Sequence, residues 1–312
     1  MKQTYKQEWK AYNLAQQNEG RLFLNLLAEA VAYIKNPTYK FGRPTLPLSE
    51  MVYAMVYKVY STFSGRRFNS QLQWAYEKGH LENLPHYNSI FNYFQNKELT
   101  PILKELVALT SAPLWFLETN IAIDATGFGT KNYQCWFSVR KGKNTEKQNW
   151  VKLHFTVGTK TNIITAVEVT KSNFHEGKLL KPLLIRTAEH FYIKEVSGDK
   201  AYLSENNLKV IHELGAEPYI PFKSNSKPTG HGMLWKKLYH YFNCRQEEFM
   251  EHYHQRSNVE ATVQMLKSKF GSSVRSKKWE AQVNEVLCKA IAHNICVIIQ
   301  QRYEMGMEPN LS

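Results

Sequence analysis

The sequence contains few cysteines and no long apolar run. Its four cysteines stand far apart, without a Cys-x-x-Cys pair, at Cys135, Cys244, Cys288 and Cys296. This spacing indicates neither a zinc site nor a framework of disulfides, and we expect reduced core residues. No stretch of roughly 18 or more apolar residues occurs, and the N-terminal segment lacks the apolar region of a secretion signal. We therefore expect a cytoplasmic protein without membrane spans.

Acidic residues are also in deficit. The chain has 40 Lys and Arg residues against 27 Asp and Glu residues, a net charge of +13, and a pI near 9.4. This excess favours a polyanionic partner, because each neutralised phosphate releases counterions, although a basic protein without such a partner remains an alternative. There is no internal repeat, no phosphate-cradling glycine loop and no nucleophile elbow.

Two of the aspartates stand in apolar surroundings. Asp124 lies in Ile-Ala-Ile-Asp-Ala-Thr-Gly, and Asp199 lies in Gly-Asp-Lys-Ala-Tyr. Both segments are typical of buried strands, where an unpaired charge costs several kcal/mol unless a metal or a partner compensates it. These aspartates are therefore candidates for a functional site.

The segment from His252 to Phe270 has the periodicity of one uninterrupted helix. At about 100° per residue, four polar residues fall within an arc of roughly 60°, beside an apolar stripe: Tyr253, Arg256, Glu260 and Lys267. Taken alone, Arg256 and Glu260 are also explained as a solvated pair one turn apart. Together with Asp124 and Asp199, however, Glu260 completes three carboxylates of the kind that hold Mg²⁺ against a phosphodiester.

These motifs, in this order, resemble the DDE transposases of bacterial insertion sequences. The resemblance rests on Asp124, on Asp199 and on the signature Tyr-x2-Arg-x3-Glu-x6-Lys from Tyr253 to Lys267. It implies that Asp124, Asp199 and Glu260 are the catalytic residues and bind two Mg²⁺ ions, which Mn²⁺ can replace. Tyr253, Arg256 and Lys267 are then expected to contact DNA phosphates.

The implied function is metal-dependent cleavage at transposon ends followed by strand transfer into target DNA. The expected partner is double-stranded DNA, both the inverted-repeat ends and the target, bound by a homodimer that associates with the nucleoid. Asp199 and Glu260 are only 61 positions apart, so we expect no large β-rich insertion of the kind that some related transposases carry. Two alternatives stay open: a ribonuclease H-like nuclease without strand transfer, and a non-catalytic DNA-binding protein derived from a transposase.

A basic stretch precedes the second predicted strand. It contains Arg140, Lys141 and Lys143, which we expect to contact DNA. Trp136 and Trp150 flank this stretch; we expect them to pack in the core, with stacking on an unpaired base as the alternative.

The predicted fold class is α/β, with a ribonuclease H-like mixed sheet flanked by helices and preceded by an all-α N-terminal domain. We expect strands over residues 121–128, 150–158, 163–170, 195–199 and 217–222, with helices over 179–191, 204–214 and 279–302. In the ribonuclease H-like fold the first and fourth strands lie side by side, which would bring Asp124 and Asp199 together.

Three regions are predicted along the chain. Residues 1–118 form the helical N-terminal domain for DNA-end binding or dimerisation, residues 119–304 form the catalytic domain, and residues 305–312 form a disordered tail. One predicted helix of the first region, over 87–96, carries candidate DNA-facing groups, with packing against the catalytic domain as the alternative: Ser89, Asn92, Tyr93 and Gln95.

Overall fold

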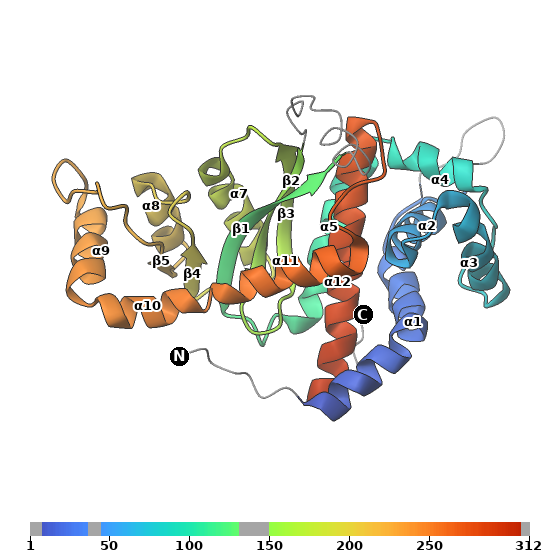
Figure 1. The fold of residues 1–312 in the computed structure, drawn as a ribbon, viewed down its shortest axis with the longest axis horizontal. Helices are drawn as coiled ribbons and strands as arrows, with labels where there is room; N and C mark the ends of the chain where they lie inside the picture. Colours follow the sequence, from blue (N-terminus) through green and yellow to red (C-terminus); the bar gives the residue numbers. More distant parts are fainter. Residues whose placement is uncertain (1–7, 37–44, 131–149, 307–312) are drawn as a thin grey trace, which may run out of the picture.

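The computed structural model describes residues 8–36, 45–130 and 150–306 (Figure 1). Its centre is a five-stranded mixed sheet in the order β3-β2-β1-β4-β5. The strands are β1 (Asn120–Gly129), β2 (Trp150–Gly158), β3 (Ile164–Lys171), β4 (Glu195–Gly198) and β5 (Glu217–Tyr219). β1 pairs antiparallel with β2 and parallel with β4. The predicted neighbourhood of the first and fourth strands is therefore confirmed.

The sheet separates two hydrophobic cores, because alternate residues of a strand point to opposite faces. Ala122 and Phe128 of β1 enter a core that contains α12 (Trp279–Met305) and α5 (Leu99–Ser111). Ile121 and Ile123 enter the other, with α7 (Leu180–Ala188), α8 (Glu205–Glu213) and α9 (Met233–Cys244). We call these the α12 core and the α7 core.

The N-terminal helices pack on the other side of α12. They are α1 (Trp9–Ala32), α2 (Leu48–Ser61), α3 (Gly65–Glu77) and α4 (Tyr87–Phe94), and Figure 1 shows α12 between α1 and α2 and the sheet. Side chains from these helices and from the sheet belong to one continuous α12 core. The predicted division of the chain near residue 118 stays a prediction, but the two parts share this core.

Helix α12 is long and apolar enough to resemble a membrane span, and it is the only such helix in the described parts of the chain. Its apolar window is 94% buried inside the molecule, so its surroundings are protein. Its role is that of a central core helix.

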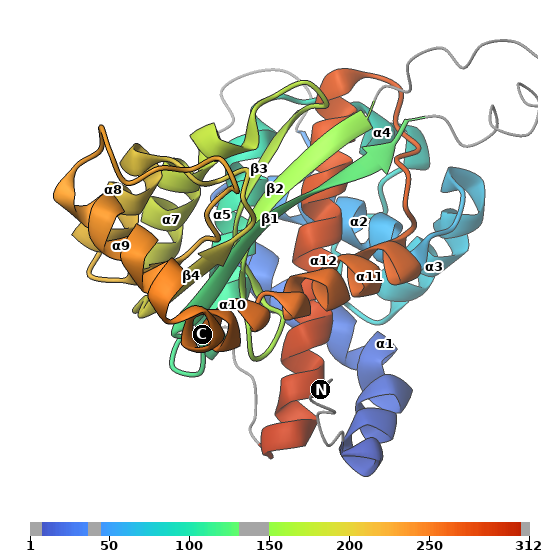
Figure 2. The same ribbon diagram turned by 60° about the vertical axis from the view of Figure 1, so that its left-hand side comes forward.

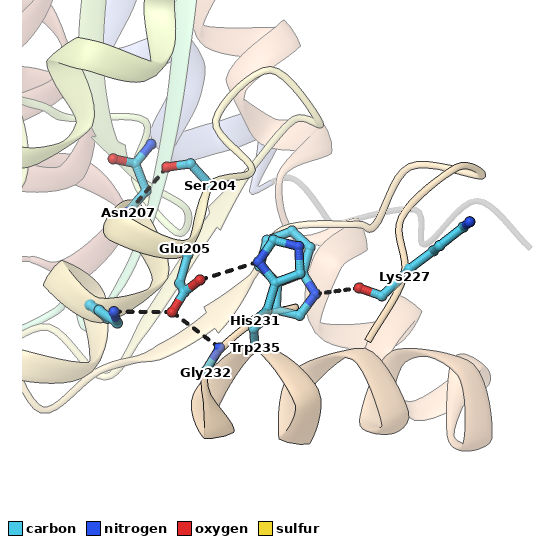
Figure 3. Close-up of polar contacts among 8 residues, drawn as sticks. Ser204, Glu205, Asn207, Lys227, His231, Gly232 and Trp235 are labelled. Atoms are coloured by element: carbon cyan, nitrogen blue, oxygen red, sulfur yellow. Dashed lines mark hydrogen bonds and ion pairs between the residues drawn. The ribbon is translucent and has the colours of Figure 1, made fainter. Parts of the chain in front are cut away.

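Polar contacts join the segment that follows β5 to α8. The carboxylate of Glu205 accepts from Gly232 N and pairs with His231 Nδ1, both at 3.2 Å, and it also pairs with Lys209 Nζ at 3.0 Å (Figure 3). Trp235 Nε1 donates to the carbonyl of Lys227 at 2.9 Å. Within the described residues, α9 is the only element between β5 and α10 (Gln246–His254), and no strand is inserted there.

Two expectations about single residues were wrong. Cys288 and Cys296 are buried and free as predicted, but Cys244 is exposed, because it ends α9 on the surface; Cys135 lies outside the described residues. Trp150 is likewise exposed and belongs to neither core; its ring lies over Gly127 of β1, where a Cβ would come within 3.1 Å of the ring. Trp136 also lies outside the described residues.

Candidate active site

The ends of two parallel strands place Asp124 and Asp199. The pairing of β1 with β4 ends at Ile123 and Gly198. Asp124 is the next residue of β1, and Asp199 is the first residue after β4. Gly198 permits this close pairing, because a Cβ there would lie 2.9 Å from a methyl group of Ile123. Figure 2 shows β1 continuing beyond the shorter β4. The carboxyl ends of adjacent parallel strands are a common position for ligand sites in α/β sheets.

Local backbone hydrogen bonds orient both carboxylates. Ala125 N donates to Asp124 Oδ1, and Ala201 N donates to Asp199 Oδ1, each at 2.8 Å. In both residues one carboxylate oxygen is thus held by its own turn. The second oxygen remains for other partners.

Arg256 contacts Asp124 from the start of α11 (Ser257–Phe270). Its Nη2 donates to Asp124 Oδ2 at 3.1 Å, and the two side chains are only 16% and 17% exposed. Burial raises the pKa of Asp124, with Asp199 adding to the rise, and the guanidinium only partly offsets this. Asp124 is therefore harder to ionise than an exposed aspartate.

Arg256 also lies in the field of the other candidate ligands. Burial lowers its pKa, but the charges of Asp124, Tyr253, Asp199 and Glu260 outweigh that effect and raise it. Its buried Nε has no hydrogen-bond partner within residues 8–36, 45–130 and 150–306. Arg256 thus contacts Asp124, lies in the field of Asp199 and Glu260, and has donor capacity that contacts with the described residues leave unused.

Glu260 differs from the two aspartates. It is exposed in the first turn of α11 and makes no hydrogen bond or ion pair with any residue that the structure describes. No three His, Cys, Asp or Glu side chains among the described residues are close enough to hold one metal ion. The structure thus brings Asp124 and Asp199 to adjacent strand ends but does not gather the predicted triad into one cluster.

The predicted uninterrupted helix over residues 252–270 was wrong. The chain forms α10 and then α11, joined by a tighter turn in which Arg256 N bonds to Tyr253 O and Val259 N to Arg256 O. Side-chain bonds hold this junction against the sheet, with Asn120 donating to Gln255 Oε1 and Asn258 donating to the carbonyl of Thr159. The break puts Tyr253 on a different helix from Glu260.

Lys267 lies farther along α11. Its Nζ is 5.8 Å from the centre of the Phe128 ring, and burial lowers its pKa. It therefore faces the distal part of β1. Arg140, Lys141 and Lys143 lie outside the described residues.

The candidate DNA-facing residues of α4 have mixed surroundings. Asn92 is exposed and Ser89 is half-buried, whereas Tyr93 packs partly against the α12 core. Gln95, directly after α4, donates to the carbonyl of Phe91. Both alternatives for this helix therefore remain predictions.

Sequence reasoning missed two side chains beside the aspartates. Tyr202, the last residue of the Gly-Asp-Lys-Ala-Tyr segment, is fully buried, and none of the residues that the structure describes bonds to its hydroxyl. Glu176 begins η2 (Glu176–Leu179), a short 3₁₀ helix after β3, and its charge contributes to the raised pKa of Asp124. The tyrosine stood in the motif around Asp199, but nothing in the spacing of Glu176 links it to the aspartates.

The family model of the transposase DDE domain matches residues 115–295. The chain therefore belongs to the transposase DDE domain family. The predicted resemblance is confirmed at this level, while the Tyr-x2-Arg-x3-Glu-x6-Lys subgroup and the origin in a bacterial insertion sequence stay predictions.

Proposed function

We propose that this member of the transposase DDE domain family cleaves DNA at transposon ends and transfers the cut strand into target DNA. The observation that carries the proposal is the convergence of Asp124 and Asp199 at adjacent strand ends, with Arg256 in the field of both and of Glu260. The family implies a DNA substrate, and the basic chain, with net charge +13, suits it.

The residues fit divalent cations in their chemistry. All three carboxylates offer the oxygen ligands that Mg²⁺ and Mn²⁺ prefer, and bound cations would favour the ionised form of Asp124, whose pKa burial raises. Asp124, Asp199 and Glu260 would hold two ions. When bound, the ions would supply activation of the attacking hydroxyl and stabilisation of the leaving oxygen.

Arg256 would position the DNA while keeping its hydrogen bond to Asp124. A guanidinium has five N–H donors, and only one is bonded to Asp124 among the described contacts. The remaining donors form a planar fork that suits a phosphate beside the one under attack. Tyr253 and Lys267 are proposed as further phosphate contacts, on α10 and α11.

The triad is tested by replacing each carboxylate with its amide. Asp124→Asn, Asp199→Asn and Glu260→Gln should each abolish cleavage while leaving binding of transposon-end DNA nearly intact, since phosphate contacts remain. Glu168→Gln, on β3 and paired with Lys104, is the matched control and should cleave normally. Metal-dependent cleavage at the wild-type rate by any triad variant would refute the assignment, as would full activity in EDTA.

Strand transfer distinguishes this proposal from a nuclease that only cuts. The purified protein should join a precut transposon end to target DNA, and cleavage without joining would favour the nuclease.

We further propose a cytoplasmic, nucleoid-associated homodimer on DNA. Arg140, Lys141 and Lys143 remain proposed DNA contacts, and their joint replacement should reduce the salt dependence of binding by about one unit for each phosphate that is no longer neutralised.

A further inference from the structure

The segment between α11 and α12 joins the end of β1 to the N-terminal helices. Gly129, the last residue of β1, accepts from Val274 N at 2.9 Å and donates to the carbonyl of Ser272 at 3.1 Å. The next residue, Arg275, donates from Nη1 to the carbonyl of Phe63 at 2.8 Å, in the turn between α2 and α3. Figure 2 shows this segment running from α11 to the start of α12 beside α3. It therefore bridges the central sheet and the helices that precede it.

A second arginine lies on the ring of the same phenylalanine. The guanidinium carbon of Arg67, in the first turn of α3, is 5.0 Å from the centre of the Phe63 ring, within the range of a cation–π contact. Phe63 itself packs against the α12 core, so its position is fixed. Arg67 and Arg275, from distant parts of the chain, are thus both held at one residue. Side chains that are ordered in advance lose less entropy when a ligand binds.

Neither guanidinium is neutralised by a neighbour. Arg67 and Arg275 are exposed, and neither forms an ion pair with a carboxylate within the described residues. The carboxylate of Glu285 is buried and accepts from the backbone amides of Arg275 and Ser276 at 2.9–3.1 Å. Burial, and after it the charge of Arg275, lowers the pKa of Lys58 to about 8, although Glu285 opposes this. The surface therefore keeps an excess of positive charge.

This surface lies along β1 from the candidate active site. Five residues separate Asp124 from Gly129, which is roughly 17 Å in a strand. A DNA duplex rises about 3.4 Å per base pair. A duplex that leaves the active site along β1 therefore reaches the surface after roughly five base pairs. Three further exposed cations flank it: Arg66, Lys277 and Lys278.

We propose that Arg67 and Arg275 form a phosphate-binding surface, shared between the N-terminal helices and the segment before α12, that holds neighbouring phosphates of one DNA strand outside the active site. The inference rests on the proposed function, because it takes DNA as the ligand. A guanidinium can grip a phosphate with two parallel hydrogen bonds. Since phosphate contacts carry no sequence information, the surface should bind any duplex.

The experiment measures the affinity of the full-length protein for two fluorescent duplexes over a range of salt concentrations. One duplex carries the transposon end, and the other has the same length and a scrambled sequence. Each phosphate contact contributes about 0.9 to the slope of log affinity against log salt, or roughly eightfold in affinity for a tenfold change in salt. At about 0.1 M salt, Arg67→Gln and Arg275→Gln should therefore each weaken binding of both duplexes roughly eightfold.

Matched variants separate a local contact from the loss of net charge. Arg245→Gln removes the same charge between α9 and α10, far from α3 in Figure 1, and should change the affinity less than about twofold. Arg67→Lys and Arg275→Lys keep the charge and should lose no more than about threefold. Arg67→Gln still tests the inference if Arg275→Gln does not fold, because Arg67 is exposed. An equal loss in Arg245→Gln would overturn the inference, as would a loss confined to the transposon-end duplex.

The inference and the proposed function fail by different results. If the wild type binds both duplexes but neither cuts nor joins DNA, the proposed function fails, and the affinities of the arginine variants still test the surface. If the wild type cuts and joins, and Arg67→Gln and Arg275→Gln bind DNA with unchanged affinity and salt slope, the phosphate-binding surface is overturned and the proposed function stands.

Discussion

Buried polar groups have different surroundings around α12 and at the ends of β1 and β4. Within α12, Asn294 accepts from Ile164 N and donates to the carbonyls of Val107 and Ile164. Lys289 Nζ donates to three carbonyls at 2.7–2.8 Å, those of Phe270, Gly271 and Ser273. These groups use nearly all their hydrogen-bonding capacity, and they join the helices to the sheet.

At the strand ends the capacity is only partly used. Arg256 Nε and the Tyr202 hydroxyl are buried and have no partner among the described residues, and Glu260 is exposed. In the part of the chain that the structure describes, two other buried atoms lack partners, Tyr53 Oη in α2 and His154 Nδ1 on β2, so unused capacity is not confined to the site. The difference still indicates where a ligand with its own donors and acceptors would be bound, because unsatisfied buried groups cost stability unless a ligand completes them.

The largest expected effect concerns the buried polar groups around α12, whose hydrogen bonds are nearly all made. Asn294→Leu leaves backbone groups of Ile164 and Val107 without partners, at about 1–3 kcal/mol each. We expect a decrease of about 4 kcal/mol in the free energy of unfolding, measured with urea. Asn243→Leu, on the exposed end of α9, should change it by less than about 0.5 kcal/mol. A decrease below about 1 kcal/mol at Asn294 would show that this network is dispensable.

The next effect concerns the residues at the ends of β1 and β4, where hydrogen-bonding capacity is unused. Arg256→Lys keeps the charge but removes the fork that can hold Asp124 and a phosphate together, and mispositioning of about 1 Å costs ~100-fold in rate. We expect single-turnover cleavage to slow by about that factor at unchanged Mn²⁺ affinity. Arg245→Lys, exposed and paired with Glu248, is the control. If raising the Mn²⁺ concentration restores the full rate, Arg256 supports the metal site instead.

A pH effect follows from His293 of α12. Burial lowers its pKa to about 4 from an ordinary value of 6.5, and its Nε2 bonds to the carbonyl of Asn162 at 2.8 Å. As pH falls from 6.5 towards 4, the unfolded chain takes up a proton that the folded protein excludes, so stability falls. The contribution of this residue should be a decrease of about 2 kcal/mol between about pH 7 and about pH 5. In His293→Gln, unfolding measured at both values should show a correspondingly smaller decline, and an unchanged decline would contradict the assignment.

The smallest effect compares two buried tyrosines. Tyr202→Phe removes a hydroxyl without a partner, so the free energy of unfolding should stay equal or rise by up to about 1 kcal/mol. Tyr57→Phe removes a hydroxyl that donates to Gln71 Oε1 at 2.9 Å and should cost about 1 kcal/mol. Equal decreases in both variants would indicate that Tyr202 has a partner in solution.

The sequence by itself determined the strands, most helix positions and the adjacency of Asp124 and Asp199. The succession of strands and helices matched the ribonuclease H-like fold, in which the first and fourth strands are neighbours, and the apolar surroundings of the two aspartates indicated that they are functional. These features depend on the local periodicity of apolar residues and on the cost of burying a charged residue, and both can be judged from the sequence alone.

Tertiary structure decided what those residues contact. The break between α10 and α11 comes from contacts of Gln255 and Asn258 with Asn120 and Thr159, which periodicity within one segment does not contain. The pairing of Arg256 with Asp124 joins positions 132 residues apart, and Asn207 joins the segment of Gly177 to that of Tyr202. The α12 core likewise joins the N-terminal helices to the sheet, because α12 presents apolar residues on all sides and is covered by both.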